Sequence, residues 1–158
     1  MDVSWSDNYG RLVFRMSNDS PRAKQFLLIC TGEKGVTYKG SRFYKLQNEG
    51  HPGEILCGGE MQSNNDNESN EAQSHLVEGI EDGGIYYRNL TRGVLAGPRY
   101  NMSDKALVFG VCTKDHKESK FRTAFGEIEE GMALLSLACQ HSPLTDIVVK
   151  ESGIMIPL

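Results

Sequence analysis

The sequence lacks any apolar run that approaches the roughly 20 residues of a membrane-spanning helix. Its first eight residues, MDVSWSDN, contain neither a basic start nor an apolar stretch, so a cleaved signal peptide is not expected. Together these absences argue against a membrane helix and a secretory leader. We therefore expect an intracellular protein, cytoplasmic or nuclear, with no membrane partner.

The usual metal-binding patterns are also missing, because the chain has no C-x-x-C pair and no H-x-x-x-H pair. The cysteines stand far apart, mostly in apolar segments, which is typical of reduced and buried thiols. Cys57 with His51, or Cys139 with His141, could be imagined as ligand pairs. Buried thiols and surface histidines are the simpler interpretation, so no metal and no cofactor are expected.

Basic residues are fewer than acidic ones: the chain has 17 lysines and arginines, 21 aspartates and glutamates, and a formal net charge of −4. This balance disfavours nucleic acid and anionic membranes as partners. Residues 62–74 contain no lysine or arginine and are rich in asparagine. We interpret this tract as a polar, acidic surface loop, with a docking site as the alternative.

Short strands and two separated helices are predicted along the chain. Ser20 and Pro21 mark a helix start, Gly32 is placed to end that helix, and a second helix is predicted over residues 131–140. The first helix should bury an apolar face formed by Ala23, Phe26, Leu27 and Cys30. Strands are predicted at 2–6, 12–16, 42–46, 55–61, 93–97, 107–112, 122–127 and 146–150. This pattern favours a mainly β domain, an antiparallel barrel with a helix over each open end.

Several motifs occur in a characteristic order. They are TGEKG at 31–35, YKGS at 38–41, CGGE at 57–60, VCT at 111–113 and FGEIEEGM at 125–132. In sequence and spacing they resemble the cyclophilin family of peptidyl-prolyl isomerases over nearly the whole chain. The resemblance implies a closed eight-stranded antiparallel β-barrel capped by two α-helices, as one domain over residues 1–158. Because the first strand begins almost at the terminus, we expect this domain to come from a larger multidomain protein.

The resemblance also implies where an active site should lie, and those positions depart from the family pattern. The family's isomerases use an apolar pocket for the proline ring, an arginine that bonds the twisting amide, and a glutamine that orients it. Lys45 stands at the arginine position and Cys57 at the glutamine position. A lysine ammonium lacks the rigid fork of a guanidinium. The degenerate positions are Lys45, Glu54, Ile55, Cys57, Gly110 and Arg122, so no catalytic residues are expected.

The groove around these positions is predicted to be remodelled. The segment 47–53 is longer than in the family, and Pro98, Arg99 and Tyr100 replace small residues and an asparagine that bind substrate backbone. Proline cannot donate a backbone hydrogen bond. The candidate groove residues are Tyr44, Lys45, Gln47, Asn48, His51, Pro98, Arg99, Tyr100, Val108 and Arg122.

The sequence therefore predicts a non-catalytic interaction module, part of a larger scaffold or regulatory protein. One alternative is a weak isomerase or a proline-peptide binder with a rebuilt pocket, and another is a structural or self-associating domain. The basic stretch 114–122 is interpreted as a solvated loop or as the border of a positive groove that suits an acidic peptide. In many members of the family a tryptophan holds cyclosporin, and no tryptophan occurs near residues 117–118, where the resemblance would place it. Cyclosporin is therefore not expected to bind.

Overall fold

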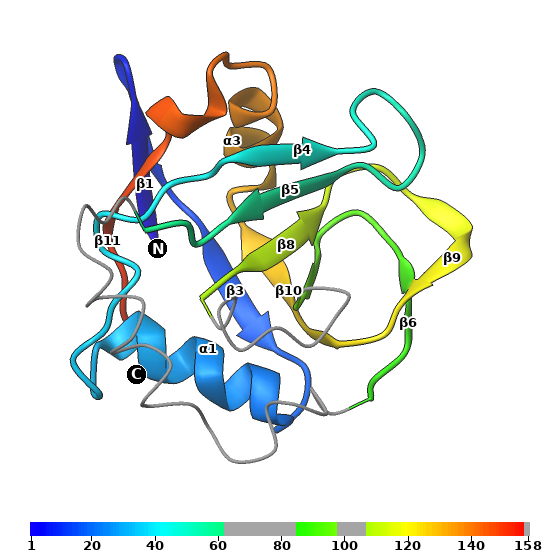
Figure 1. The fold of residues 1–158 in the computed structure, drawn as a ribbon, viewed down its shortest axis with the longest axis horizontal. Helices are drawn as coiled ribbons and strands as arrows, with labels where there is room; N and C mark the ends of the chain where they lie inside the picture. The colour runs from blue at the N-terminus through cyan, green and yellow to red at the C-terminus, as the bar shows by residue number, and fades with distance from the viewer. Residues whose placement is uncertain (62–84, 98–106, 157–158) are drawn as a thin grey trace.

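The computed structural model describes residues 1–61, 85–97 and 107–156, and its strands form three antiparallel sheets (Figure 1). The order is β11-β1-β2 in the first sheet, β3-β10-β7-β8-β5-β4 in the second and β6-β9 in the third. The strands are β1 (Asp2–Trp5), β2 (Asn8–Arg11), β3 (Val13–Met16), β4 (Lys45–Gln47), β5 (Ile55–Gly58), β6 (Arg88–Leu90), β7 (Val94–Ala96), β8 (Phe109–Cys112), β9 (His116–Phe121), β10 (Ala124–Glu130) and β11 (Val148–Glu151).

Helix α1 (Pro21–Thr31) begins and ends where the sequence predicts. The Ser20 hydroxyl accepts a hydrogen bond from the Ala23 N–H at 3.2 Å, which satisfies one of the free donors of the first turn. Gly32 adopts a left-handed conformation with φ 70°, and its N–H donates to the Leu28 carbonyl. The predicted buried face is wrong at Leu27, which is partly exposed, whereas Ile29 is buried.

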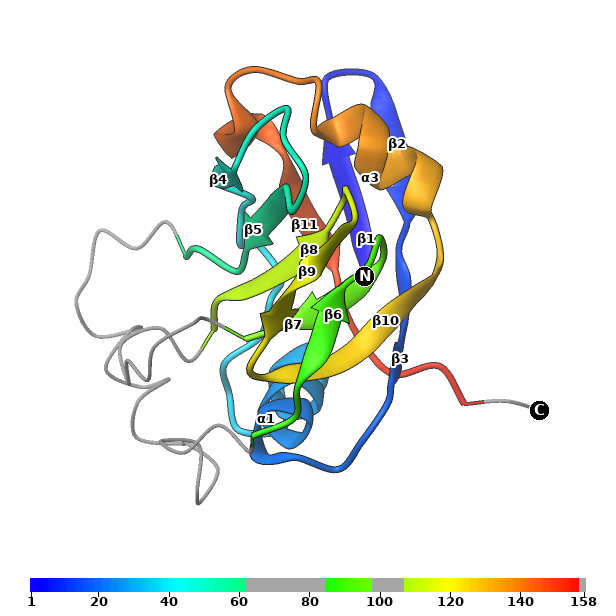
Figure 2. The same cartoon turned by 90° about the vertical axis from the view of Figure 1, so that its right-hand side faces the viewer.

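Helix α3 (Met132–Ala138) follows Gly131, and the two α-helices of the described residues lie at opposite ends of the molecule (Figures 1 and 2). Leu134 of α3 packs closely on β2, because a Cβ built on Gly10 would lie 2.6 Å from its Cδ2 atom. A short 3-10 helix, η2 (Leu144–Asp146), precedes β11. None of the helices in the described segments is long and apolar enough to cross a membrane.

Phe109 of β8 lies at the centre of an aromatic core. Its ring centroid is 5.3 Å from that of Tyr38, 5.4 Å from that of Phe26, 5.9 Å from that of Phe43 and 6.4 Å from that of Phe14. Phe109, Tyr38 and Phe43 are each only 1% exposed. These rings pack mostly edge to face, the arrangement that aromatic quadrupoles favour, and they join α1 to the six-stranded sheet.

The structure confirms a mainly β domain with two α-helices but contradicts the closed eight-stranded barrel. In the described residues, β3 and β4 are the two edges of the second sheet, and residues 40–43 before β4 meet β11 through an isolated bridge and a few backbone hydrogen bonds that are not extended into a ladder of the same sheet. Register shifts interrupt the ladders between Asp2 and Val3 and between Ala124 and Gly126. Such irregularities leave residues unpaired, and strands this short end before a continuous ladder can form.

Among the residues that the structure describes, three strands were not predicted, namely β2, β6 and β9. The stretch 114–122, interpreted as a solvated loop, is instead largely strand β9, which pairs with β6. Its exposed lysines and single glutamate obscured the β pattern, because a two-stranded ribbon at the surface need not alternate apolar and polar residues.

Candidate functional site

A row of residues crosses the outer face of the six-stranded sheet. Lys45 on β4 pairs with Cys57 on β5, Cys57 pairs with Gly110 on β8, and Gly110 pairs with Ala96 on β7. Directly opposite residues project to the same face of a sheet. The structure therefore brings together three positions that the resemblance singles out, although they lie far apart in sequence.

The neighbouring residues along these strands face the other way, into the core. Leu56, Leu95 and Val111, each next to a residue of the row, are fully buried. Lys45 itself is exposed and Cys57 is partly exposed. The row thus presents an ammonium and a thiol outward, supported from below by the packed core.

The space above Gly110 is filled by Ile55. A Cβ atom built on Gly110 would lie 2.7 Å from the Ile55 Cγ2 atom, which is closer than two carbons can approach. Ile55 pairs with Cys112, the residue two positions beyond Gly110, so its side chain reaches Gly110 diagonally across the ladder. The family resemblance implies a phenylalanine at this position as the floor of the proline pocket. Its side chain cannot be accommodated at Gly110 while Ile55 keeps its position.

Glu54 is buried, with 5% of its surface exposed, and its carboxylate is held in a turn. One oxygen accepts from the Gly50 N–H at 2.7 Å and the other from the Thr113 hydroxyl at 2.6 Å. The Glu54 main-chain carbonyl also accepts from the Thr113 N–H at 2.8 Å. These bonds offset the desolvation of the carboxylate, and they tie the turn to the end of β8.

The segment after β4 is an ordered turn. The Asn48 side-chain amide donates to the Gly53 carbonyl at 3.3 Å, and the His51 N–H donates to the Asn48 carbonyl at 3.0 Å. The Gly53 N–H donates to the Lys114 carbonyl at 2.9 Å. Two predicted groove residues, Asn48 and His51, are therefore exposed on a turn that is anchored at both ends, and a third, Gln47, is exposed at the end of β4.

The remaining groove candidates lie around this row. Tyr44 is partly buried, and burial raises the pKa of its hydroxyl to about 12, so the phenol stays protonated. Val108 is partly exposed just before β8, and Arg122 is exposed just before β10. Pro98, Arg99 and Tyr100, as well as the tract 62–74, lie outside the described residues.

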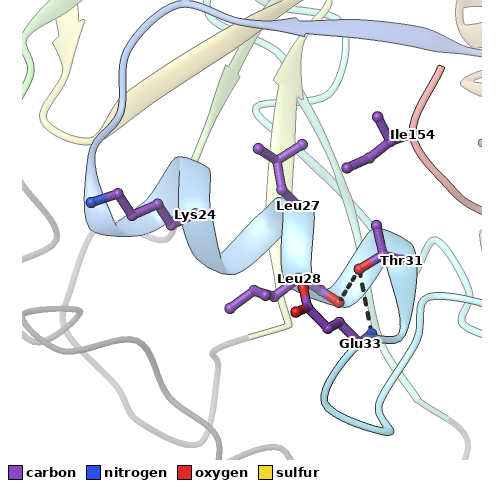
Figure 3. Close-up of a pocket in the computed structure, with 6 residues that line it drawn as sticks. All are labelled: Lys24, Leu27, Leu28, Thr31, Glu33 and Ile154. Carbon is purple, nitrogen blue, oxygen red and sulfur yellow. Dashed lines mark hydrogen bonds between the residues drawn. The ribbon is translucent and has the colours of Figure 1, made fainter. Parts of the chain in front are cut away.

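An open apolar pocket of about 370 Å³ lies elsewhere, on the outer surface of α1 (Figure 3). Lys24, Leu27, Leu28, Thr31, Glu33 and Ile154 line it. It is at the end of the molecule opposite β4 and β5, and no predicted site residue contributes to it (Figures 1 and 2). The helical periodicity predicts Leu27 in the core, whereas the structure places it at this pocket.

Burial keeps three of the four cysteines protonated, whereas Cys57 is partly exposed in the row. Burial raises the pKa of Cys30 and of Cys139 to about 12, and that of Cys112 to about 11. A thiol must lose its proton to act as a nucleophile or as a metal ligand. Within the described segments, no three histidine, cysteine or acidic side chains are placed to hold a metal ion.

The fold and site define a β-rich domain with two capping helices and a polar row on the outer face of its main sheet. Comparison with protein families matches residues 1–153 to the family described as cyclophilin type peptidyl-prolyl cis-trans isomerase/CLD. The chain belongs to this family. Membership supports a role in the isomerase family or as a proline-binding module.

Proposed function

We propose that this domain binds peptides or proline-containing proteins without catalysing prolyl isomerisation, as an interaction module of a larger scaffold or regulatory protein. The observation that carries the proposal is the row Lys45–Cys57–Gly110, with Ile55 above Gly110. By the family resemblance, this row stands where an arginine, a glutamine and a phenylalanine act in the isomerases.

The energetics of the reaction support this assignment. Rotation about a prolyl peptide bond has a barrier of roughly 18–20 kcal/mol, which falls only if the enzyme stabilises the twisted amide. A guanidinium offers several donors in a fixed plane, whereas the Lys45 ammonium is a flexible, strongly hydrated point charge, here exposed to solvent. A thiol at Cys57 is a much weaker donor than a glutamine amide. The row is suited to binding a peptide rather than to twisting it.

Isomerase activity is measured directly by NMR exchange spectroscopy on an Ala-Pro peptide. We expect the domain to produce no cis–trans exchange cross-peaks above the uncatalysed level, and we expect Lys45→Arg to restore none, because Ile55 still fills the space above Gly110. Exchange that Lys45→Ala abolishes would show instead that the domain is a weak isomerase with a rebuilt pocket. Peptide chemical shifts recorded in the same titration report binding without turnover.

Cyclosporin gives an independent test of the groove. We expect no rise in the melting temperature when it is added, since the remodelled row lacks the apolar floor and the tryptophan that many family members offer. A ligand that binds only the native state raises the apparent stability by about 2.7 kcal/mol at 100 times its dissociation constant. A clear thermal shift in differential scanning fluorimetry would therefore contradict this expectation.

A further inference from the structure

A ribbon formed by β6 and β9 lies at one side of the molecule and faces the viewer in Figure 2. Arg88 pairs with Phe121, and Asn89 pairs with Lys120. Just before β6, the Tyr86 N–H donates to the Arg122 carbonyl at 2.9 Å, so the two tyrosines at 86–87 lie beside Arg122. We call Tyr86, Tyr87, Lys120 and Arg122 the tyrosine–cation strip.

The side chains of this strip are exposed. Tyr87 is 64% exposed and Tyr86 is 42% exposed, and Lys120 and Arg122 are also exposed. An exposed tyrosine offers a large, rigid contact area at a low cost in conformational entropy, which is why tyrosine is common in binding surfaces. Two adjacent exposed tyrosines with two cations are therefore suited to contact with another molecule.

The two cations have no acidic partner among the residues that the structure describes. Arg88 on the same ribbon differs, because its Nη2 atom lies 3.1 Å from Glu127 Oε2, and the other oxygen of Glu127 binds Arg15. The strip therefore carries positive charge that its described neighbours do not neutralise, on a chain with a net charge of −4. This charge favours a partner with carboxylates, which form charge-assisted hydrogen bonds to lysine and arginine.

The strip is connected to the row on the main sheet through the backbone of β10. The row Lys45–Cys57–Gly110–Ala96 ends on β10 at Ala124, which pairs with Ala96. The Ala124 N–H donates to the Tyr86 carbonyl at 3.1 Å. The link between them is therefore made by the backbone, since Ala96 and Ala124 are only 1% and 2% exposed.

We infer that the tyrosine–cation strip binds an acidic peptide segment of a partner protein. The inference rests on the proposed interaction function and names the chemistry of the partner. Single-stranded nucleic acid is less favoured, because the chain is acidic overall and Glu118 interrupts the basic residues of β9.

Fluorescence anisotropy with a labelled glutamate-rich peptide that contains no proline tests the strip separately from the row. We expect binding that weakens as salt is raised, and loss of affinity by roughly tenfold or more in the Lys120→Glu/Arg122→Glu variant. The Lys120→Arg variant should retain binding. Lys150→Glu is the control for added negative charge elsewhere, because Lys150 is exposed on β11 and this change shifts the net charge in the same direction by half as much.

The tyrosine contribution has its own control. Tyr87→Ala should weaken binding several-fold, whereas Tyr9→Ala should not, although Tyr9 is 65% exposed and thus resembles Tyr87 in accessibility. Circular dichroism melting of each variant checks that the fold is intact.

Four outcomes would overturn the inference. The first is equal binding of a peptide with glutamine at every glutamate, and the second is an equal loss in Lys150→Glu. The third is tighter binding of a single-stranded oligonucleotide that is lost in the same double variant. The fourth is a rise in peptide affinity when Asp66 is replaced by asparagine and Glu68 and Glu71 by glutamine. That result would mean that the strip binds the acidic tract 62–74 of the chain itself. Because the peptide lacks proline, none of these outcomes bears on whether the row catalyses isomerisation.

Discussion

Replacing Gly110 with phenylalanine, the residue that the family resemblance places there, is expected to destabilise the domain by about 3 kcal/mol, at the upper end of overpacking costs. Even the Cβ atom of the new side chain would lie 2.7 Å from Ile55 Cγ2. Strands β5 and β8 are hydrogen-bonded at this point, so they cannot separate without losing the ladder. The φ of Gly110 lies outside the left-handed region, and the cost is therefore steric rather than a backbone strain.

Because the clash involves one side chain, Ile55, a second substitution should relieve it. Ile55→Ala combined with Gly110→Phe is expected to be more stable than the sum of the single changes predicts, with an interaction energy of about 1–3 kcal/mol in urea unfolding. Gly153→Ala is the matched control, since a Cβ atom there would meet nothing within 4 Å. Additive single and double variants would show that Ile55 does not occupy the space above Gly110.

The second large effect is expected at Glu54. Glu54→Ala should lower the free energy of unfolding by about 2–3 kcal/mol, because it removes two hydrogen bonds to a charged carboxylate, from the Gly50 N–H and from the buried Thr113 hydroxyl, and leaves that hydroxyl only the Glu54 carbonyl at 3.2 Å. The turn that carries Asn48 and His51 should loosen at the same time. Faster amide hydrogen exchange at Gly53, whose N–H donates to the Lys114 carbonyl, would report that loosening.

Glu60→Ala provides the comparison for Glu54. Glu54 lies just before β5 and is buried, whereas Glu60 lies just after β5 and is exposed. We expect its urea midpoint to change little, because exposed substitutions are usually within about 0.5 kcal/mol of neutral. Equal effects of the two substitutions would mean that the Glu54 carboxylate does not anchor the turn.

Local features of the chain could be predicted because their physics is local. Ser20 caps the first helix with its own side chain, and Gly32 ends that helix in a conformation that other residues adopt at a cost. The motifs that carry the family resemblance spread over nearly the whole chain, and the family match covers residues 1–153. The positions of Lys45, Cys57 and Gly110 on one row follow from that resemblance, not from their spacing.

The polar ribbon shows where local patterns are insufficient. Strand β9 contains Lys117, Glu118 and Lys120, a composition that is typical of a loop, yet it pairs with β6 across a long stretch of sequence. Its conformation depends on the partner strand rather than on its own propensity, since β-propensity mostly reflects packing against neighbours. For the same reason, the exposure of the Tyr86 and Tyr87 side chains could not be predicted from the sequence.

The sequence by itself determined the family, the two helices and most strands of the six-stranded sheet, because capping, periodicity and motif order are encoded over a few residues each. Tertiary structure alone decided that the ladders do not close into a barrel, since register shifts and isolated bridges arise where distant strands meet. It also decided that Ile55 covers Gly110 and that Glu54 is held in a turn rather than left in a pocket. Both depend on which strands lie side by side, and pairing between distant segments is set by the packing of the whole domain.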